Sequence, residues 1–316
     1  MGRRPGGWAM REVGVKHAIE LERLRMEYVN GRGIHGLTLQ VERGESFGLL
    51  GPRGAGKSTT LRTLVGLMAP DGGTARVAGR DIVADGVGVR RVTGYLSSES
   101  ELYLGMTGEE ALVFSLRVRG CPERMGRGVE LARRLCVDLR PRLRSLSDGQ
   151  RRKVALVVAL AHDPEVLILD EPTAGLDLLE RAELFGVLRS EREAGKTIFL
   201  GSQEWSEVEE LCERVGILRD GLLVEVVEVE VLGRDRVKRV EVRFRGAAPD
   251  VAAWPGCSEL RVDGTRAWFA FVGPIGVLFE RLAGSEVIDA SVSEPSLEEV
   301  LRALGRGDGE AGERDG

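Results

Sequence analysis

The sequence is poor in the features that mark several common classes of protein. Its 45 Lys+Arg against 50 Asp+Glu give a net charge of −5, so the basic excess typical of a nucleic-acid-binding protein is missing. The four cysteines share no CxxC or Cys/His spacing, which argues against a disulfide framework and a zinc site. No apolar run approaches the roughly 18 residues of a membrane span, since the best candidate, 268–279, is broken by Gly273, Pro274 and Gly276. We therefore expect a soluble intracellular protein without a nucleic-acid partner.

Lysine is also scarce, with only five among the 45 basic residues, and this draws attention to Lys57. Lys57 lies in segment 51–58, GPRGAGKS, which matches the phosphate-binding pattern GxxxxGK[ST]. The segment follows an apolar run at 47–50 and precedes apolar residues at helical spacing that extend to Met68, the strand–loop–helix context that the pattern requires. Glycines let backbone N–H groups point at phosphate oxygens, while Lys57 can reach the outer phosphates and Ser58 can bind Mg²⁺.

A second motif supplies carboxylates. Segment 166–171, VLILDE, is typical of a buried strand that ends in Asp170 and Glu171. Asp170 can hold Mg²⁺, and Glu171 can orient or deprotonate an attacking water. Carboxylates at the end of a strand are often only exposed to solvent. Together with the phosphate-binding segment, however, Asp170 and Glu171 predict hydrolysis of a nucleoside triphosphate.

Further segments resemble one family. Segment 146–150, LSDGQ, resembles the LSGGQ signature of ABC-type ATPases, with Asp148 in place of a glycine. A serine such as Ser147 could otherwise be read as a helix N-cap. Segment 172–177, PTAGLD, resembles the family's continuation after the strand carboxylates, and Tyr28 lies where the family has an aromatic residue that stacks on adenine.

The resemblance implies a set of site residues and a second subunit. Those implied for ATP binding within one subunit are Tyr28, Gly51, Arg53, Gly54, Ala55, Gly56, Lys57, Ser58 and Thr59. The implied catalytic residues are Lys57, Glu171 and Gln203, and the implied metal ligands are Ser58, Asp170 and Ser98. Family members pair head-to-tail, so Ser147, Gly149 and Gln150 would act on ATP held by a second ATP-binding subunit, identical or related.

Three positions depart from the family pattern. Ser98 occupies the position of a glutamine, and its shorter side chain would reach the metal or the γ-phosphate only through water. Gln203 replaces a histidine, so it can donate a neutral hydrogen bond but not a charge-assisted one, which is about twice as strong. Arg53 replaces the commoner asparagine at a position expected to face outward. These departures predict that ATP binding persists while hydrolysis is weakened.

We expect an α/β fold of the P-loop NTPase class. It would have a RecA-like parallel sheet core, antiparallel β and helical subdomains, and a small C-terminal α+β domain, where apolar and charged residues alternate over 239–244. The expected divisions are a flexible leader at 1–15, an ABC-type ATP-binding domain at 16–228 with a helical insertion at about 105–150, an accessory domain at 229–304 that includes a helix over 297–304, and a disordered tail at 305–316.

The leading functional interpretation is the ATP-hydrolysing motor subunit of a membrane exporter. Segment 294–300, EPSLEEV, resembles the C-terminal tails of ATPases from drug-export or ABC-2-type transporters. That resemblance implies a separate polytopic permease subunit and a peripheral position on the inner face of the cell membrane. The alternative is a non-transport nucleotide sensor or regulatory ATPase with little turnover. The sequence leaves open the transported substrate, the direction of transport and the choice between homodimer and heterodimer.

Overall fold

The computed structural model describes residues 16–99, 102–234, 237–273 and 275–293. The leader at 1–15, the helix expected over 297–304 and the tail at 305–316 lie outside the described residues.

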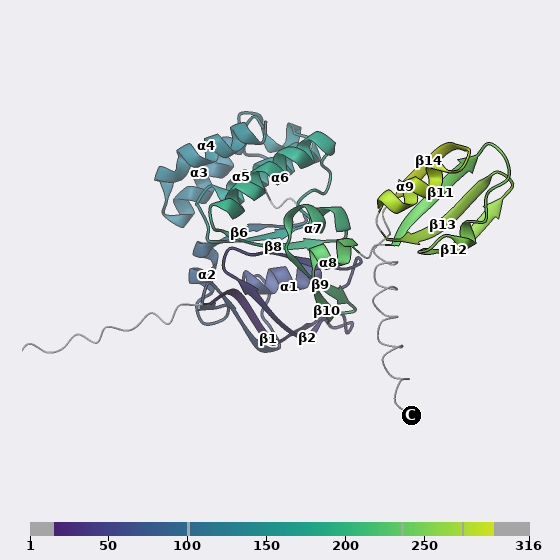
Figure 1. The fold of residues 1–316 in the computed structure, drawn as a ribbon. Helices are drawn as coiled ribbons and strands as arrows, with labels where there is room; N and C mark the ends of the chain where they lie inside the picture. Colours follow the sequence, from purple (N-terminus) through teal and green to yellow (C-terminus); the bar gives the residue numbers. More distant parts are fainter. Residues whose placement is uncertain (1–15, 100–101, 235–236, 274, 294–316) are drawn as a thin grey trace, which may run out of the picture.

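A six-stranded sheet forms the centre of the molecule (Figure 1). Its strands are β3 (Ser46–Leu50), β6 (Thr93–Leu96), β7 (Val166–Asp170), β8 (Thr197–Ser202), β9 (Arg214–Arg219) and β10 (Leu222–Glu228). The order is β10-β9-β3-β8-β7-β6, and every pair is parallel except the antiparallel pair of β9 and β10. The carboxyl ends of β3, β7 and β8 therefore meet at one edge, which brings the two sequence motifs together.

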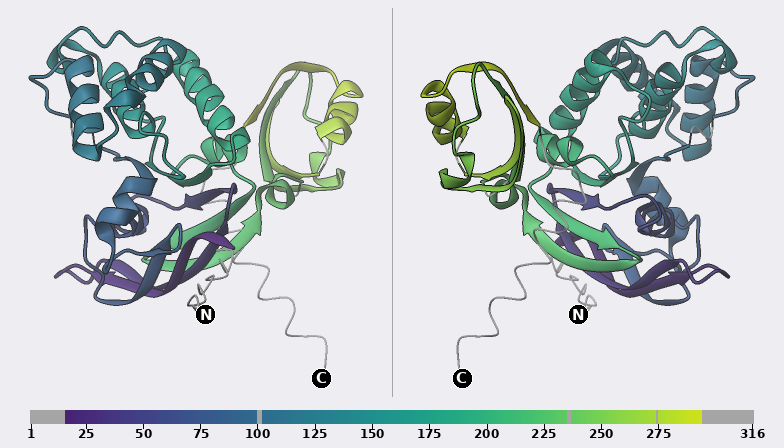
Figure 2. Two further views of the ribbon diagram at one scale, coloured as in Figure 1. Left: turned by 90° about the vertical axis from the view of Figure 1, so that its left-hand side faces the viewer. Right: turned by 90° about the vertical axis from the view of Figure 1, so that its right-hand side faces the viewer.

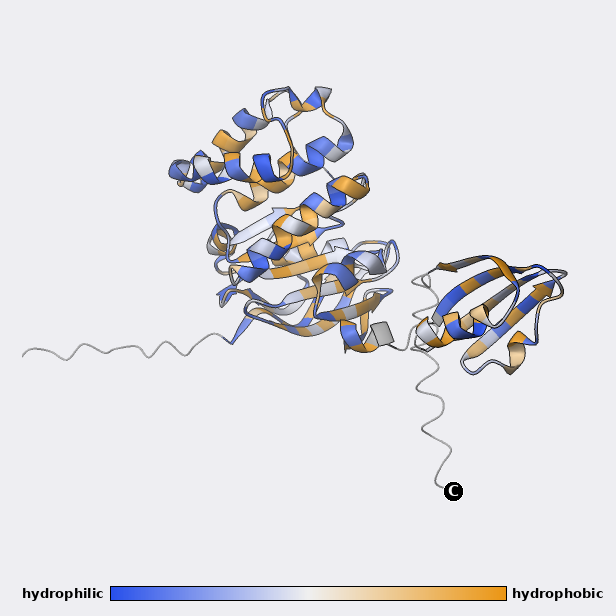
Figure 3. Cartoon of the chain, turned by 45° about the horizontal axis from the view of Figure 1, so that its top comes forward, coloured by the Kyte–Doolittle hydropathy of each residue, from blue (hydrophilic) through white to orange (hydrophobic). Residues whose placement is uncertain are grey.

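Side chains alternate between the two faces of this sheet. Along β3, Phe47 and Leu49 belong to one hydrophobic cluster, whereas Leu50 belongs to the other. Such alternation between two buried faces is expected for a sheet with covers on both sides, and the sheet is correspondingly apolar in Figure 3.

An antiparallel sheet and one helix cover the first face. The sheet has the order β2-β1-β4-β5, and its strands are β1 (His17–Glu27), β2 (Gly33–Glu42), β4 (Gly72–Val77) and β5 (Arg80–Asp81). Helix α1 (Lys57–Leu64) shares one buried cluster with both sheets, and α2 (Gly86–Val92) follows β5. The expected helix to Met68 is too long, because Gly66 at φ 70° and backbone bonds from Gly66 to Thr63 and from Leu67 to Arg62 end it.

Helices cover the second face. They are α3 (Gly108–Arg119), α4 (Met125–Arg134), α5 (Asp148–Leu160), α6 (Leu178–Glu193) and α7 (Trp205–Leu211), with 3₁₀ turns at Pro122–Arg124 and Leu143–Ser145. Helices α3 and α4 form the outer part of this layer (Figure 2). In the part of the chain that the structure describes, every helix is too short or too polar to serve as a transmembrane span.

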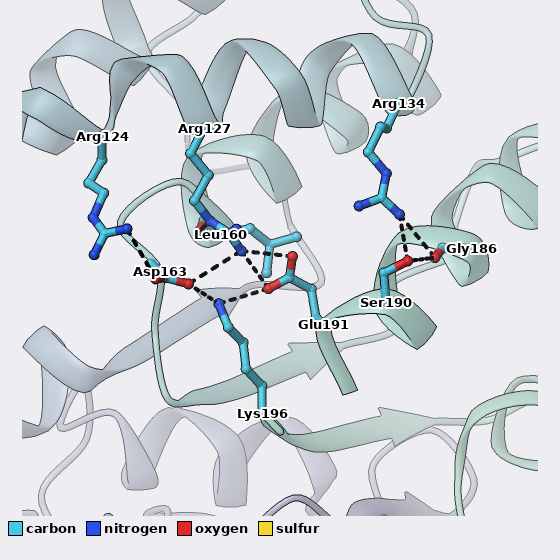
Figure 4. A network of polar contacts seen from close by, with 9 residues as sticks. All are labelled: Arg124, Arg127, Arg134, Leu160, Asp163, Gly186, Ser190, Glu191 and Lys196. Atoms are coloured by element: carbon cyan, nitrogen blue, oxygen red, sulfur yellow. Dashed lines mark hydrogen bonds and ion pairs between the residues drawn. The ribbon is translucent and has the colours of Figure 1, made fainter. Parts of the chain in front are cut away.

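Five charged residues fasten α4 to the sheet core, and we call them the clasp: Arg124, Arg127, Asp163, Glu191 and Lys196 (Figure 4). Arg127 donates to Glu191 Oε1 at 2.7 Å, and Lys196 lies 2.8 Å from Glu191 Oε2. Asp163 is paired with Lys196 and lies 3.1 Å from Arg124. The clasp therefore joins α4 and the 3₁₀ turn before it to α6, to the turn before β7 and to the residue that precedes β8.

The C-terminal part forms a separate antiparallel sheet. Its elements are α8 (Val229–Arg234), β11 (Val237–Phe244), a 3₁₀ turn (Val251–Ala253), β12 (Cys257–Asp263), β13 (Arg266–Val272), α9 (Ile275–Ala283) and β14 (Val287–Ser293). The strand order is β12-β13-β11-β14, and Leu278 and Leu282 of α9 pack with Val240, Val242 and Phe269 of the sheet. Both the predicted parallel sheet core and the predicted small C-terminal α+β unit are thus confirmed.

Candidate nucleotide-binding site

The phosphate-binding segment forms the turn between β3 and α1. Gly56 has φ 105°, and a Cβ atom there would lie 2.8 Å from the carbonyl oxygen of Gly33, so only glycine fits. A Cβ atom at Gly51 would lie 2.3 Å from the carbonyl oxygen of Leu218. The tight turn directs the N-terminus of α1, with its positive dipole end, at the space above the loop.

Lys57 is the first residue of α1 and is 4% exposed. Its Nζ donates to the carbonyl oxygens of Gly51 at 2.6 Å and Pro52 at 3.1 Å, and lies 3.7 Å from Glu171 Oε1. Burial lowers the pKa of Lys57, while the charges of Glu171 and Asp170 oppose the shift. The ammonium group thus stands between the loop and the strand-end carboxylates.

Asp170 ends β7 and is fully buried. Neither of its carboxylate oxygens has a hydrogen-bond partner among the described residues, an exceptional state for buried oxygens. A Cβ atom built on Gly201 would lie 3.4 Å from Asp170 Oδ1 and 3.7 Å from Lys57 Cβ, so this carboxylate adjoins the first turn of α1. Unpartnered carboxylate oxygens beside the hydroxyl-bearing turn of Ser58 fit Mg²⁺, which prefers oxygen ligands.

Glu171 is the next residue and departs from ordinary backbone geometry. Its φ is 47°, a left-handed value that costs a non-glycine residue energy and is found preferentially at functional sites. Its N–H donates to the carbonyl oxygen of Gly201 at 2.8 Å. The Gln203 amide donates to Glu171 Oε1, the same oxygen that faces Lys57. The two predicted catalytic side chains of the strand ends are therefore in direct contact.

A cavity of about 660 Å³ opens over these groups. It is lined by Tyr28, Asn30, Arg32, Gly33, Arg53, Gly54, Gly56, Lys57, Ser58, Thr59, Arg62, Ser98, Glu99, Glu171 and Gln203. Four cationic side chains against two carboxylates suit a polyanionic ligand. Tyr28 lies beside the loop, with its hydroxyl 3.4 Å from Thr59 Oγ1.

The structure changes the interpretation of some predicted residues. Arg53 is exposed as expected, but it lines the cavity and does not simply face outward. Gly51 and Ala55 do not line the cavity, because Gly51 approaches the β9 backbone and Ala55 is buried in the core. Ser98 lines the cavity, and its carbonyl oxygen accepts a bond from Arg152 at 2.8 Å.

Five lining residues escaped the sequence reasoning: Asn30, Arg32, Gly33, Arg62 and Glu99. Asn30 and Arg32 follow Tyr28 in the turn between β1 and β2, and Glu99 follows Ser98. Their proximity to already recognised positions was the only available signal, because no local motif marks them.

The signature residues lie elsewhere on the same subunit. Ser147 caps α5, accepting from the Gln150 backbone at 3.1 Å while Gln150 Oε1 accepts from Ser147 N at 3.3 Å. Ser147 and Gln150 are exposed, Gly149 is buried, and none of the three lines the cavity. The N-cap interpretation of Ser147 is confirmed, whereas action on a partner's ATP stays a prediction.

A phosphate-binding turn at the carboxyl edge of a parallel sheet, facing carboxylates on a neighbouring strand, defines a P-loop nucleoside triphosphatase. Comparison with known proteins narrows the class. The family model described as ABC transporter matches residues 34–174. The chain belongs to the ABC transporter family, in the group of its ATP-binding subunits, and the prediction of an ABC-type ATPase is confirmed.

Individual relatives agree with this assignment. The chain is 33% identical over 304 residues to the daunorubicin resistance ATP-binding protein DrrA3 of Streptomyces coeruleorubidus, covering 91% of this chain and 95% of the relative. It is 39% identical over 216 residues to the daunorubicin/doxorubicin resistance ATP-binding protein DrrA of Streptomyces peucetius, covering 66% of this chain and 64% of that protein. A solved ATP-binding subunit of an ABC transporter superposes with a TM-score of 0.63 at 29% identity, covering 68% of this chain and 91% of the other.

Proposed function

We propose that this chain is the ATP-hydrolysing subunit of a membrane exporter, that it pairs head-to-tail with a second ATP-binding subunit, and that its own hydrolysis is slow. The observation that carries the proposal is the convergence of Lys57, Asp170, Glu171 and Gln203 below one cationic cavity. The resistance functions in the names of the relatives support export as the process served.

The residues of one subunit would divide the work of binding. Lys57 and the N–H groups of the loop hold the phosphates, and Tyr28 stacks on the base. Ser58 and Asp170 would hold Mg²⁺, and Ser98 would contribute to this site through water. Mg²⁺ bound there supplies charge neutralisation at the outer phosphates. Glu171 then orients the attacking water and accepts its proton.

The contact between Gln203 and Glu171 supports slow turnover. An amide that donates to Glu171 Oε1 competes with the attacking water for that carboxylate oxygen. The neutral amide also supplies no cationic stabilisation of charge on the γ-phosphate. Ser98 adds to the effect because its side chain is too short to bridge directly to the metal.

A groove on the helical layer supports a membrane partner. This cavity of about 440 Å³ is lined by residues of α2, α3 and the loop before α3, among them Val87, Tyr103, Phe114 and Val118, which are all at least half exposed. Arg90, Arg91 and Arg119 add positive charge. An apolar helix end that carries carboxylates, from a separate polytopic permease subunit, fits this surface. The chain would then lie on the inner face of the cell membrane.

The division of the chain forms part of the proposal. Residues 16–228 would form the ATP-binding domain, with its helical insertion at about 105–150, and 229–304 would form an accessory domain. The separate hydrophobic cluster of the C-terminal sheet supports an accessory unit that begins with β11, whereas Val229 of α8 packs in the cluster of the ATP-binding core.

Calorimetry and steady-state kinetics test the proposal. We expect MgATP to bind the parent chain and Lys57→Ala to abolish binding. The parent should bind ATP more tightly with Mg²⁺ than with EDTA, and Asp170→Asn should remove this difference in ATP affinity. The parent kcat should rise by about 10-fold or more in the double variant Ser98→Gln/Gln203→His, because each restored contact acts on the transition state.

The exposed residue Gln40 offers a matched control, and Gln40→His should leave kcat unchanged. Absence of any heat with saturating MgATP would reject the nucleotide site. Fast parental turnover that the double variant does not alter would reject slow hydrolysis and leave the site itself standing.

A further inference from the structure

Arg152 lies in the second turn of α5, five residues after the signature serine Ser147, and is 4% exposed. It forms no side-chain ion pair among the described residues. Burial lowers the pKa of Arg152, while the charges of Asp170, Glu207 and Glu171 oppose the shift. A buried guanidinium without a paired carboxylate is costly unless its N–H groups are satisfied, so its hydrogen bonds need an explanation.

All of those bonds go to backbone carbonyls of the nucleotide site. Towards one side, Arg152 Nη1 donates to Ser97 O at 2.6 Å and Ser98 O at 2.8 Å. Towards the other, Nη2 donates to the carbonyl oxygens of Asp170 and Glu171, and Nε donates to Pro172 O at 3.3 Å. One side chain thus ties α5 to the segment that carries Ser98 and to the segment that carries Asp170 and the general base Glu171.

The arrangement constrains Glu171 in particular. Its left-handed backbone is unfavourable for a residue with a side chain and persists only when its surroundings hold it. Arg152 helps to stabilise this backbone conformation, because its side chain donates hydrogen bonds to the carbonyl oxygens of Glu171 and of the residues on either side.

The far end of the same segment is fixed independently. Glu207 of α7 is 3% exposed and accepts from both the hydroxyl and the backbone N–H of Thr173, and from the Ser202 hydroxyl. Residues 170–173 are therefore anchored to α5 at one end and to α7 at the other. A displacement of α5 would turn Glu171 relative to a fixed Thr173.

We propose that Arg152 is a positioning residue that couples the signature helix to the catalytic carboxylate and Ser98 of its own subunit. The inference rests on the proposed head-to-tail pair. When the signature at the start of α5 engages ATP in the partner subunit, the helix moves, and Arg152 transmits this movement to the base over the subunit's own ATP. The two ATP sites of a pair thereby become cooperative: binding of ATP at one site changes the rate of hydrolysis at the other.

The test compares Arg152→Lys, Arg152→Met and the control Arg134→Lys in the full chain. Lys at position 152 keeps the charge in the same place but cannot reach both groups of carbonyls, whereas Arg134 bonds Gly186 O and Ser190 Oγ, away from both the cavity and the signature. Measured quantities are kcat, KM and the Hill coefficient for ATP, the calorimetric affinity of MgATP, and Tm.

We expect both Arg152 variants to lose about 10- to 100-fold in kcat, as for a small misplacement of a catalytic group, with KM and affinity within about threefold of the parent. The Hill coefficient should fall from above 1 in the parent to about 1, and Arg152→Lys should restore Tm relative to Arg152→Met without restoring kcat. A Lys variant with parental kcat and Hill coefficient, or a parent that turns over without cooperativity, would overturn the proposal. A parent that binds no MgATP would refute the proposed function instead.

Discussion

Buried charge concentrates at the end of β7. Lys57, Arg152 and Glu207 are each at most 4% exposed, and Asp170 is fully buried. Burial lowers the pKa of the first two and raises the pKa of Glu207. In such a low-dielectric region each charge acts strongly on its neighbours, so the arrangement is preorganised for a charged ligand before any ligand arrives.

His162 makes a separate residue-scale prediction about pH. Burial lowers the pKa of His162 to about 4, from an ordinary value of 6.5, and the nearby Arg119 adds to the effect. Below about pH 6.5 the imidazole of His162 binds a proton in the unfolded chain but not in the folded chain. The contribution of neutral His162 to the free energy of unfolding is therefore fully present above that pH and is lost as the pH falls towards 4. The loss from this residue approaches about 3 kcal/mol.

We expect Tm measured by calorimetry to fall less between pH 7 and pH 4 in His162→Asn than in the parent. His35 is partly exposed, and His35→Asn should retain the parental slope. Parallel pH profiles for His162→Asn and the parent would contradict the assignment.

Site residues that lie in one contiguous motif were predictable from the sequence, whereas a residue whose contacts are distant in the sequence was not. Lys57, Ser58, Asp170 and Glu171 lie in contiguous motifs whose chemistry follows from order along the chain, and the structure brings them to one edge of the sheet. Arg152 gave no such signal, because its function depends on carbonyls at least 18 residues away that only the folded chain assembles.

At the scale of elements, the attachment of the helical layer matters most. The strands at 47–50 and 166–170 and the helix after the first of them were predictable from short apolar runs and helical spacing. The clasp was not, since its charges lie far apart in the sequence and meet only in the folded chain (Figure 4). Arg134 of α4 adds a second link, donating to Ser190 Oγ at 2.7 Å. Helix α4 is thus held to α6 along its length by polar contacts.

Removing the centre of the clasp should loosen this attachment. Glu191→Ala would remove one of the two carboxylates that face Lys196 and Arg127, and Asp163 would remain as the other. The loss of hydrogen bonds to this buried carboxylate should cost about 1–3 kcal/mol. We expect the first calorimetric transition to shift down by several degrees. The exposed neighbour Glu193 provides the control, and Glu193→Ala should stay within about 0.5 kcal/mol of the parent. Equal Tm values for the two variants would rule out a structural contribution from the clasp.

At the scale of the molecule, the site residues fall into two sets on one chain. Lys57 and Glu171 face the cavity, whereas Ser147 and Gln150 are exposed at the start of α5, away from the cavity. Neither composition nor periodicity indicates that the second set has a ligand, and only the family resemblance predicted it. An exposed signature that lies off the cavity of its own subunit is what two copies arranged head-to-tail require.

Complementation between two defective subunits tests that arrangement. Lys57→Ala destroys phosphate binding, and Ser147→Arg places a bulky side chain on the exposed signature without touching the subunit's own cavity, so each variant alone should lack turnover. In a mixed head-to-tail pair one composite site joins both defects, while the other keeps an intact loop and an intact signature. Random pairing of equal amounts leaves a quarter of the composite sites intact. The coupling proposed for Arg152 slows these sites, because the signature of the subunit that carries the intact loop has no ATP to engage on its partner. The restored rate, measured by phosphate release after mixing, should therefore lie above zero and below a quarter of the parental rate. A subunit carrying both substitutions, mixed with either single variant, should restore nothing, because every composite site then contains a defect. Full activity of Ser147→Arg on its own would show that ATP is hydrolysed within one subunit and would exclude the head-to-tail pair.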